Sequence, residues 1–266
     1  MKIAIFLFAA LVTSFTSTAQ ETKVYSVYND LIVGNIYHLF STDVKLRKEP
    51  NTTSEVLKTL ALGAEINVLE KTKDTMTYQG ELANWYKVKY NDLTGYVLRS
   101  LIAINYQEMG STTYLFNVAR IDEMDNLKVR VLRADGTLIN QKYNLNTGTF
   151  QIEIDDSKGL DKVQEIIFIH YYAEACGVDG GGIYLFYDGE RLIKAAELQS
   201  VADADLFWYV EELIFPDDDE SLKNKVRYTR ESGETIDYET NWVEEKYFSR
   251  EYEWSGSGWN HPLDQE

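Results

Sequence analysis

The sequence predicts a mainly β protein in two parts, a small N-terminal barrel followed by an antiparallel β-sandwich or meander. Short stretches that alternate apolar and polar residues recur along the chain and are separated by turn residues, as in all-β folds. Aromatic residues are abundant, with 19 Tyr, 11 Phe and 5 Trp. The charge also changes abruptly near residue 104, because residues 1–104 carry a net +1 and residues 105–266 a net −18. Such a step indicates a domain boundary.

The start of the chain has the pattern of a secretory signal peptide over residues 1–19. Lys2 precedes an apolar run from Ile3 to Val12, and small residues follow up to Ala19. The run is shorter than the roughly 20 residues that a spanning helix needs, and no later stretch reaches that length. We therefore expect a periplasmic or secreted protein without a membrane span.

Residues 41–104 are expected to form the barrel. Val44 and Leu46 alternate with polar neighbours, and Gly63 permits a tight turn before the next strand. Trp85 and Val88 lie three residues apart, which places them on opposite faces of a regular strand. Gly95 allows the backbone to pass close to a neighbouring strand.

The order and spacing of six short motifs in this segment resemble the bacterial SH3 (SH3b) domain family. The motifs are Val44-Lys45-Leu46-Arg47-Lys48-Glu49-Pro50, Ser54-Glu55-Val56-Leu57, Leu60-Ala61-Leu62-Gly63, Ile66-Asn67-Val68-Leu69, Trp85-Tyr86-Lys87-Val88 and Gly95-Tyr96-Val97. The resemblance implies a barrel of five to seven strands without catalytic groups, of a kind that often binds short peptides or peptidoglycan stem peptides. Two departures are a Tyr at position 96, where the family more often has Trp, and a longer segment between Leu69 and Trp85.

Five side chains are the candidate ligand contacts of this module. The aromatic rings of Tyr78, Trp85, Tyr86 and Tyr96 offer flat contact area at low entropy cost, and Arg47 is able to pair with a peptide carboxylate. The alternative is that the rings form barrel core and that Arg47 is solvated. The expected partner is a peptide, a peptidoglycan stem peptide or another envelope protein.

Residues 105–266 are expected to form an acidic β-rich domain, for which we recognise no family. Asp135-Gly136 and Asp188-Gly189 predict hairpins, and Ser232-Gly233 predicts a further turn. The apolar run 166–169 is typical of a strand buried on both faces. One short helix is expected over residues 194–204.

A cysteine hydrolase is the alternative function. SH3b modules often accompany cell-wall peptidases of the NlpC/P60 type, which need a thiolate activated by a histidine. Here Cys176 is the single cysteine, and His170, Asp179 and His261 are the polar groups that would have to converge on it. The strand in which that family carries its histidine has none here, and a lone thiol is commonly a small buried hydrophobe.

The sequence predicts no catalytic constellation, no metal and no cofactor. The acidic run 217–220 lacks the alternation of a calcium loop, and the acidic second part disfavours nucleic acid. A cluster of aromatic residues near the C-terminus has two interpretations: a platform that binds a sugar or a partner, or the core face of a last strand. The alternation of Tyr252 and Trp254 favours the core face. That cluster is Tyr247, Phe248, Tyr252, Trp254 and Trp259. We therefore predict an exported, non-enzymatic envelope protein that binds through its barrel.

Overall fold

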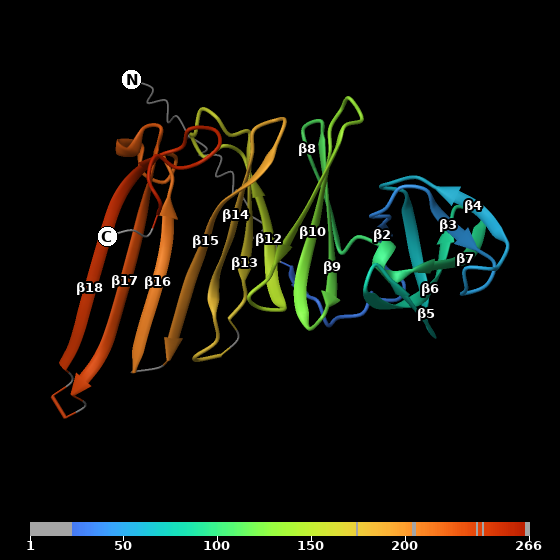
Figure 1. Cartoon of the computed structure of the whole chain (residues 1–266), viewed down its shortest axis with the longest axis horizontal. Coiled ribbons are helices and arrows are strands. Elements are labelled where there is room, and N and C mark those ends of the chain that lie inside the picture. The colour runs from blue at the N-terminus through green and yellow to red at the C-terminus, as the bar shows by residue number, and fades with distance from the viewer. Residues whose placement is uncertain (1–22, 174, 204–205, 238, 241, 264–266) are drawn as a thin grey trace, which may run out of the picture.

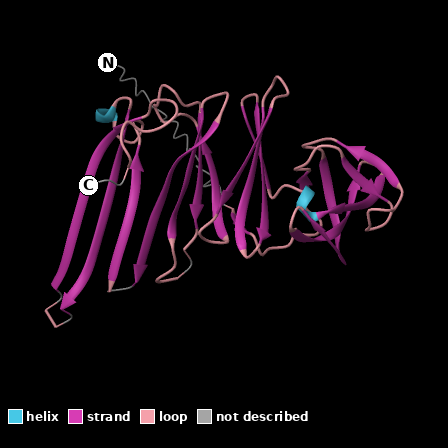
Figure 2. Ribbon diagram, in the orientation of Figure 1, coloured by secondary structure: helices cyan, strands magenta, loops and turns pink. Residues whose placement is uncertain are grey.

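The computed structural model describes residues 23–173, 175–203, 206–237, 239–240 and 242–263 as three antiparallel sheets (Figures 1 and 2). The elements are β1 (Val24–Ser26), β2 (Ile36–His38), β3 (Val44–Arg47), β4 (Val56–Leu60), β5 (Glu65–Tyr78), β6 (Glu81–Tyr90), β7 (Leu93–Leu98), η1 (Arg99–Leu101), β8 (Asn105–Met109), β9 (Thr112–Ile121), β10 (Met124–Leu132), β11 (Leu138–Asn144), β12 (Thr149–Asp155), β13 (Glu165–Tyr171), β14 (Gly180–Tyr187), β15 (Leu192–Asp203), β16 (Phe207–Ile214), η2 (Glu220–Leu222), β17 (Lys225–Asp237) and β18 (Trp242–Glu253). The fold is mainly β, as the sequence predicts. The expected leader, residues 1–19, lies outside the described residues.

The barrel is a curled sheet in the strand order β2-β5-β6-β7-β3-β4, at one end of the molecule (Figure 1). Its interior holds Leu46, Val68, Val88 and Val97, each buried. Its sheet begins at β2, five residues before the expected start at residue 41, because β2 pairs with β5 through Tyr37 and Ile66. Gly63 has a φ of 73°, as expected for its turn.

The second part begins as a sandwich. The small sheet β11-β10-β9-β8 packs over one end of an eight-stranded sheet ordered β1-β12-β13-β14-β15-β16-β17-β18. Phe116, Val129, Ile167 and Leu185 bring the two sheets together in a shared core. Ile167 and Ile169 face this core while Ile166 faces a second one, so these three residues are buried on the two faces of the strand as predicted, whereas Phe168 is only partly buried. β1, from the segment before the barrel, adds an edge strand beside β12.

The remaining strands continue as a meander beyond the small sheet (Figure 1). Loops and the chain's C-terminal turn cover one face of it around Phe186, Phe215, Tyr252 and Trp254. This core does not extend to the residues at which β16 and β18 begin, where apolar side chains such as Phe207 and Trp242 are exposed. The eight-stranded sheet therefore has one end that the small sheet does not cover.

Two local predictions in this part are wrong. The segment expected to be helical lies in β15, because Ala195, Ala196 and Leu198 all contribute to the second core. Ser232-Gly233 is not a turn but the middle of β17, where Gly233 pairs with Trp208. The predicted hairpins at Asp135-Gly136 and Asp188-Gly189 are present between β10 and β11 and between β14 and β15. None of the helices in the described ranges is long and apolar enough to cross a membrane.

The barrel packs directly against the small sheet. Phe40 and Ala103 lie against Leu115, and the Arg130 guanidinium sits 4.6 Å from the centre of the Phe40 ring while it donates to the Phe40 carbonyl. His38 stacks on Tyr106 with the ring centres 3.8 Å apart. These contacts give the barrel a fixed position against β8, β9 and β10.

A candidate ligand surface on the barrel

Three of the five predicted ligand residues share one patch on the outside of the barrel. We call this patch the outer aromatic cluster. Its buried members are Ala83, Trp85 and Leu98, and its partly buried members are Met76, Tyr78, Tyr96 and Leu101. The buried members of the cluster differ from those of the barrel interior, and Leu101 packs against both groups, so the strands β5, β6 and β7 carry apolar side chains on both of their faces.

Strand alternation explains why the cluster forms. Trp85 lies opposite Leu98, and Lys87 lies opposite Tyr96, on the adjacent strands β6 and β7. Side chains at every second position share a face, so Trp85 and Lys87 point out of the barrel while Tyr86 and Val88 point in. The opposite orientation of Trp85 and Val88 is as predicted. Trp85 is only 4% exposed and forms the floor of the cluster, with Tyr78 and Tyr96 at its surface.

Arg47 extends this surface onto β3. It lies opposite Tyr96 in a short β3–β7 pairing, next to the irregularity that follows Leu46. Its guanidinium donates to the Ser54 carbonyl at 2.9 Å, which fixes the side chain near the loop that follows β3. Among the described residues no ion pair joins Arg47 to a carboxylate. Arg47, Tyr96 and Lys87 thus form one row across three strands.

Tyr86 departs from the prediction because it faces the barrel interior. It is fully buried, and its hydroxyl donates to Asp30 Oδ1 at 3.2 Å and accepts from the Leu31 amide at 3.3 Å. Burial raises the pKa of Tyr86 to about 12. The side chain therefore tethers the segment before β2 to the barrel, and a ligand on the surface cannot reach it.

Two further residues of this surface were not predicted. Lys87 supplies a cation beside Tyr96, and Met76 contributes an adaptable apolar side chain from the long strand β5. Strand alternation predicts the position of Lys87, because Lys87 lies two residues after Trp85 and so shares its face. The pairing of Met76 with Ala83 depends on an irregularity in β5 that follows Lys71, for which the sequence offers no signal.

The thiol and the histidines of the hydrolase alternative lie in different surroundings. Cys176 is exposed in the loop between β13 and β14, so the expectation that it is a buried hydrophobe is wrong. His170 stacks on Phe168 at 5.1 Å, and His261 lies in the C-terminal turn. Within the described ranges no hydrogen bond joins Cys176 to a histidine.

The acidic run 217–220 has structural contacts. Asp219 accepts from the Ser221 amide at the start of η2 and pairs with Arg227 at 2.9 Å, and both interactions lower its pKa. Asp218 accepts from the Phe215 amide at 3.0 Å. Across the part of the chain that the structure describes, no three His, Cys, Asp or Glu side chains gather closely enough to hold a metal ion.

The tail aromatics divide between core and surface. Tyr252 and Trp254 are buried, and the Trp259 indole donates to the Ala195 carbonyl at 2.7 Å, so these three belong to the second core. Tyr247 is 64% exposed on β18. Their core role is the interpretation that the alternation favours.

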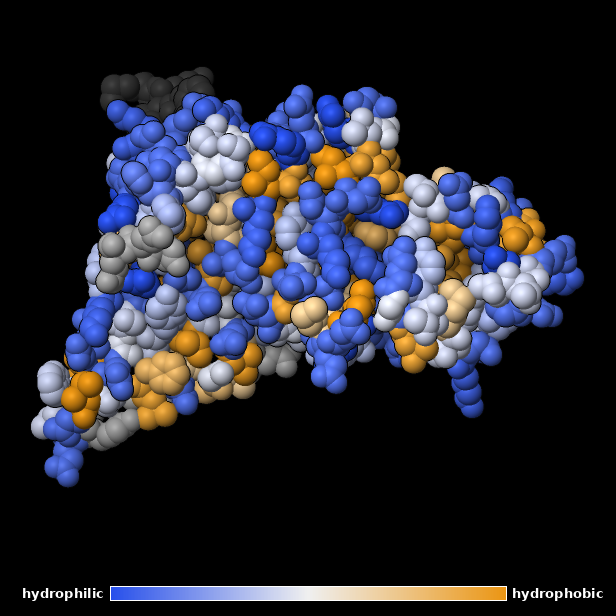
Figure 3. Space-filling view, in the orientation of Figure 1, coloured by the Kyte–Doolittle hydropathy of each residue, from blue (hydrophilic) through white to orange (hydrophobic). Residues whose placement is uncertain are grey.

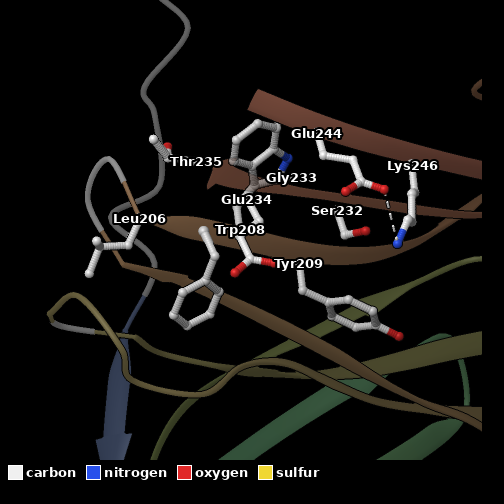
Figure 4. Close-up of a pocket in the computed structure, with 10 residues that line it drawn as sticks. Leu206, Trp208, Tyr209, Ser232, Gly233, Glu234, Thr235, Glu244 and Lys246 are labelled. Atoms are coloured by element: carbon white, nitrogen blue, oxygen red, sulfur yellow. Dashed lines mark ion pairs between the residues drawn. The ribbon is translucent and has the colours of Figure 1, made fainter. Parts of the chain in front are cut away.

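An open pocket of about 570 Å³ lies at the uncovered end of the large sheet (Figure 4). Trp208 covers Gly233 there, beside Tyr209, Glu234 and Lys246. The space-filling view shows hydrophobic side chains emerging at this end, at the lower left (Figure 3). The sequence does not indicate this pocket, because Ser232-Gly233 has the composition of a turn rather than of a strand.

Comparison with known proteins adds one identification. No curated protein and no solved structure matches the chain. A family model does match part of it, and the matched segment runs from β3 to the residues after η1 and includes all five predicted ligand residues. Residues 42–103 match the family model of the bacterial SH3 domain, so the barrel is similar to the family that its motifs predicted.

Proposed function

We propose that this chain is an exported, non-enzymatic envelope protein whose barrel binds a short peptide, with the stem peptide of peptidoglycan as the preferred ligand. The observation that carries the proposal is the outer aromatic cluster with Arg47 beside it. A bacterial SH3 domain itself suggests a module that binds peptide or peptidoglycan.

The chemistry of the surface fits a short peptide with a free carboxylate. Tyr78 and Tyr96 offer partly exposed rings over a rigid floor formed by Trp85, so little side-chain freedom is lost on binding. Arg47 and Lys87 flank Tyr96 and supply the cations that a carboxylate needs. The guanidinium uses only part of its donor capacity on Ser54, because arginine carries five N–H donors.

The test uses the full-length protein with intact peptidoglycan sacculi in sedimentation assays and with purified muropeptides in calorimetry. We expect both to bind the wild type. Tyr96→Ala and Arg47→Ala should each weaken muropeptide binding about tenfold, which corresponds to about 1.4 kcal/mol. Tyr172→Ala is the matched control, because Tyr172 is exposed and directly follows β13, a strand that does not belong to the barrel. A folded wild type that binds neither sacculi nor muropeptides would make the barrel a scaffold.

A further inference from the structure

The edge strand β18 is long, and among the described residues it has a neighbouring strand on one side only. β18 runs over Trp242–Glu253, and in the strand order it ends the eight-stranded sheet beside β17. It contains no proline. A long edge of this kind presents backbone N–H and C=O groups that can pair with a further strand.

The C-terminal turn covers one end of this edge and reveals which residues face outward. The Glu253 carbonyl accepts from the Asn260 amide at 3.0 Å, and the Glu253 amide donates to Asn260 Oδ1 at 3.1 Å. Glu253 therefore directs its backbone groups away from β17. Because the pairing with β17 is continuous from Val243 to Glu253, alternation makes every second residue face outward, and these residues are Val243, Glu245, Tyr247, Ser249 and Glu251.

The free part of the edge, residues 243–251, is centred on Tyr247. Two copies of β18 that pair antiparallel about a two-fold axis at Tyr247 use this whole segment and end before the residue that Asn260 covers. Tyr247 then faces its own copy, Val243 faces Glu251, and Glu245 faces Ser249. In each of these pairs both residues direct their backbone groups across the junction, as a hydrogen-bonded antiparallel ladder requires.

The charges on β18 favour this same register. With the axis at Tyr247, Glu244 faces Arg250 of the other copy and Lys246 faces Phe248, and no like charges are directly opposite. An axis at Phe248 places Glu245 opposite Glu251 and Lys246 opposite Arg250. An axis at Lys246 or at Glu245 places that residue opposite its own copy. Opposed like charges destabilise a strand pair, whereas opposite charges contribute about 0.2–1 kcal/mol.

We propose that β18 pairs with β18 of a second copy of this chain, joining two eight-stranded sheets into one continuous sheet with its two-fold axis at Tyr247. Within one copy Glu244 pairs with Lys246 at 3.5 Å, the contact drawn as a dashed line in Figure 4, and the Arg250 guanidinium lies 5.2 Å from the Phe248 ring centre. All four side chains occupy alternate positions and so share a face. In the dimer the Glu244 carboxylate of one copy lies opposite Arg250 of the other copy on that face and forms an ion pair with it.

Charge reversal tests the register in the full-length protein by light scattering and sedimentation velocity. We expect the wild type to have the mass of two chains. Glu244→Arg and Arg250→Glu, made singly, place like charges opposite each other and should weaken dimerisation about tenfold or more. The double variant restores opposite charges and should dimerise like the wild type. Glu212→Arg, exposed on β16 and two strands from the edge, is the control and should stay dimeric. Circular dichroism checks that each variant is folded.

Cross-linking tests the position of the axis independently. In a Cys176→Ser background, Tyr247→Cys brings two thiols to facing positions, where α-carbons about 5.5 Å apart allow a disulfide. Ser249→Cys leaves the two thiol-bearing residues about 14 Å apart along the strands, because the facing residue of the other copy is Glu245. Rapid cross-linking of Tyr247→Cys alone supports the proposal. A monomeric wild type at every concentration, a double variant that stays monomeric, or equal cross-linking at both positions overturns it.

Discussion

Gly95 lies so close to Arg47 that a Cβ at position 95 would be 2.6 Å from the Arg47 carbonyl oxygen. Side-chain atoms of Leu46 would lie within 3.0 Å of the same Cβ. The short β3–β7 pairing, which also positions Arg47 beside Tyr96, therefore depends on a residue without a side chain. Gly95→Ala should destabilise the protein by about 1–3 kcal/mol, because backbone atoms cannot move aside as a flexible side chain can. Urea unfolding measures this loss.

Gly258→Ala is the matched control for that substitution. A Cβ at Gly258 meets no atom within 4 Å, so the same chemical change should alter the free energy of unfolding by less than about 0.5 kcal/mol. Equal effects of the two substitutions would show that the close approach of β3 and β7 has no energetic weight.

Substitutions of Trp85 and of Tyr96 should differ in their effects on folding stability and on ligand binding. Trp85 is the buried floor of the outer aromatic cluster, so Trp85→Ala should cost about 3–5 kcal/mol of folding free energy. Tyr96 is partly buried at the cluster's surface, so Tyr96→Ala should change stability less and muropeptide affinity more. Thermal unfolding and calorimetry on the same samples measure the two effects. A Tyr96 variant that loses as much stability as the Trp85 variant would contradict the assignment of floor and surface.

The barrel was predictable because its signals are local. The turn at Gly63 and the opposite orientation of Trp85 and Val88 follow from residue type and strand alternation. The same alternation limits the ligand site, because Trp85 and Tyr86 are neighbours on one strand and cannot both line its outer face. The sequence does not say which of the two faces in. That choice depends on Asp30 and Leu31, which reach Tyr86 from a distant segment.

The errors in the second part arise where tertiary contacts outweigh local preference. The alanines of β15 favour a helix in isolation, but Ala195 and Ala196 provide the small surfaces on which Trp259 and its neighbours pack. The pair Ser232-Gly233 is typical of a turn. Gly233 nevertheless lies within a strand, because the Trp208 ring occupies the space above it. Neither partner is near in sequence, so neither effect was predictable from a local window.

Gly233→Ala should displace the Trp208 indole. A Cβ at position 233 would lie 2.1 Å from the ring, and the ring is the movable end of a side chain at the rim of an open pocket. We expect a loss of at most about 1 kcal/mol in unfolding free energy, since an aromatic ring over a strand glycine stabilises a sheet only modestly. The tryptophan emission of the variant should be red-shifted relative to that of the wild type, because the displaced indole is more exposed to water. The same substitution in a Trp208→Phe background should cause no such shift. A blue shift would mean that the indole becomes more buried.

Tyr86 should make stability depend on pH in the alkaline range. Its pKa lies near 12 in the folded chain because burial disfavours the phenolate, against 10.0 for an ordinary tyrosine. Between these values the unfolded chain loses the proton and the folded chain keeps it, so the contribution of Tyr86 to stability is complete below pH about 10 and falls as the pH rises towards 12.

Tyr86→Phe tests this dependence. The variant lacks the hydrogen bonds to Asp30 and Leu31, so it should be less stable than the wild type by about 1 kcal/mol or more at neutral pH. The variant also lacks the ionisable hydroxyl, so the gap between the two proteins should narrow above pH about 10. Urea unfolding at a series of pH values measures the gap. A gap that stays constant between pH about 9 and 11 would mean that the Tyr86 hydroxyl titrates at the same pH in the folded and unfolded chains, and a gap that widens would mean that it titrates at a lower pH in the folded chain.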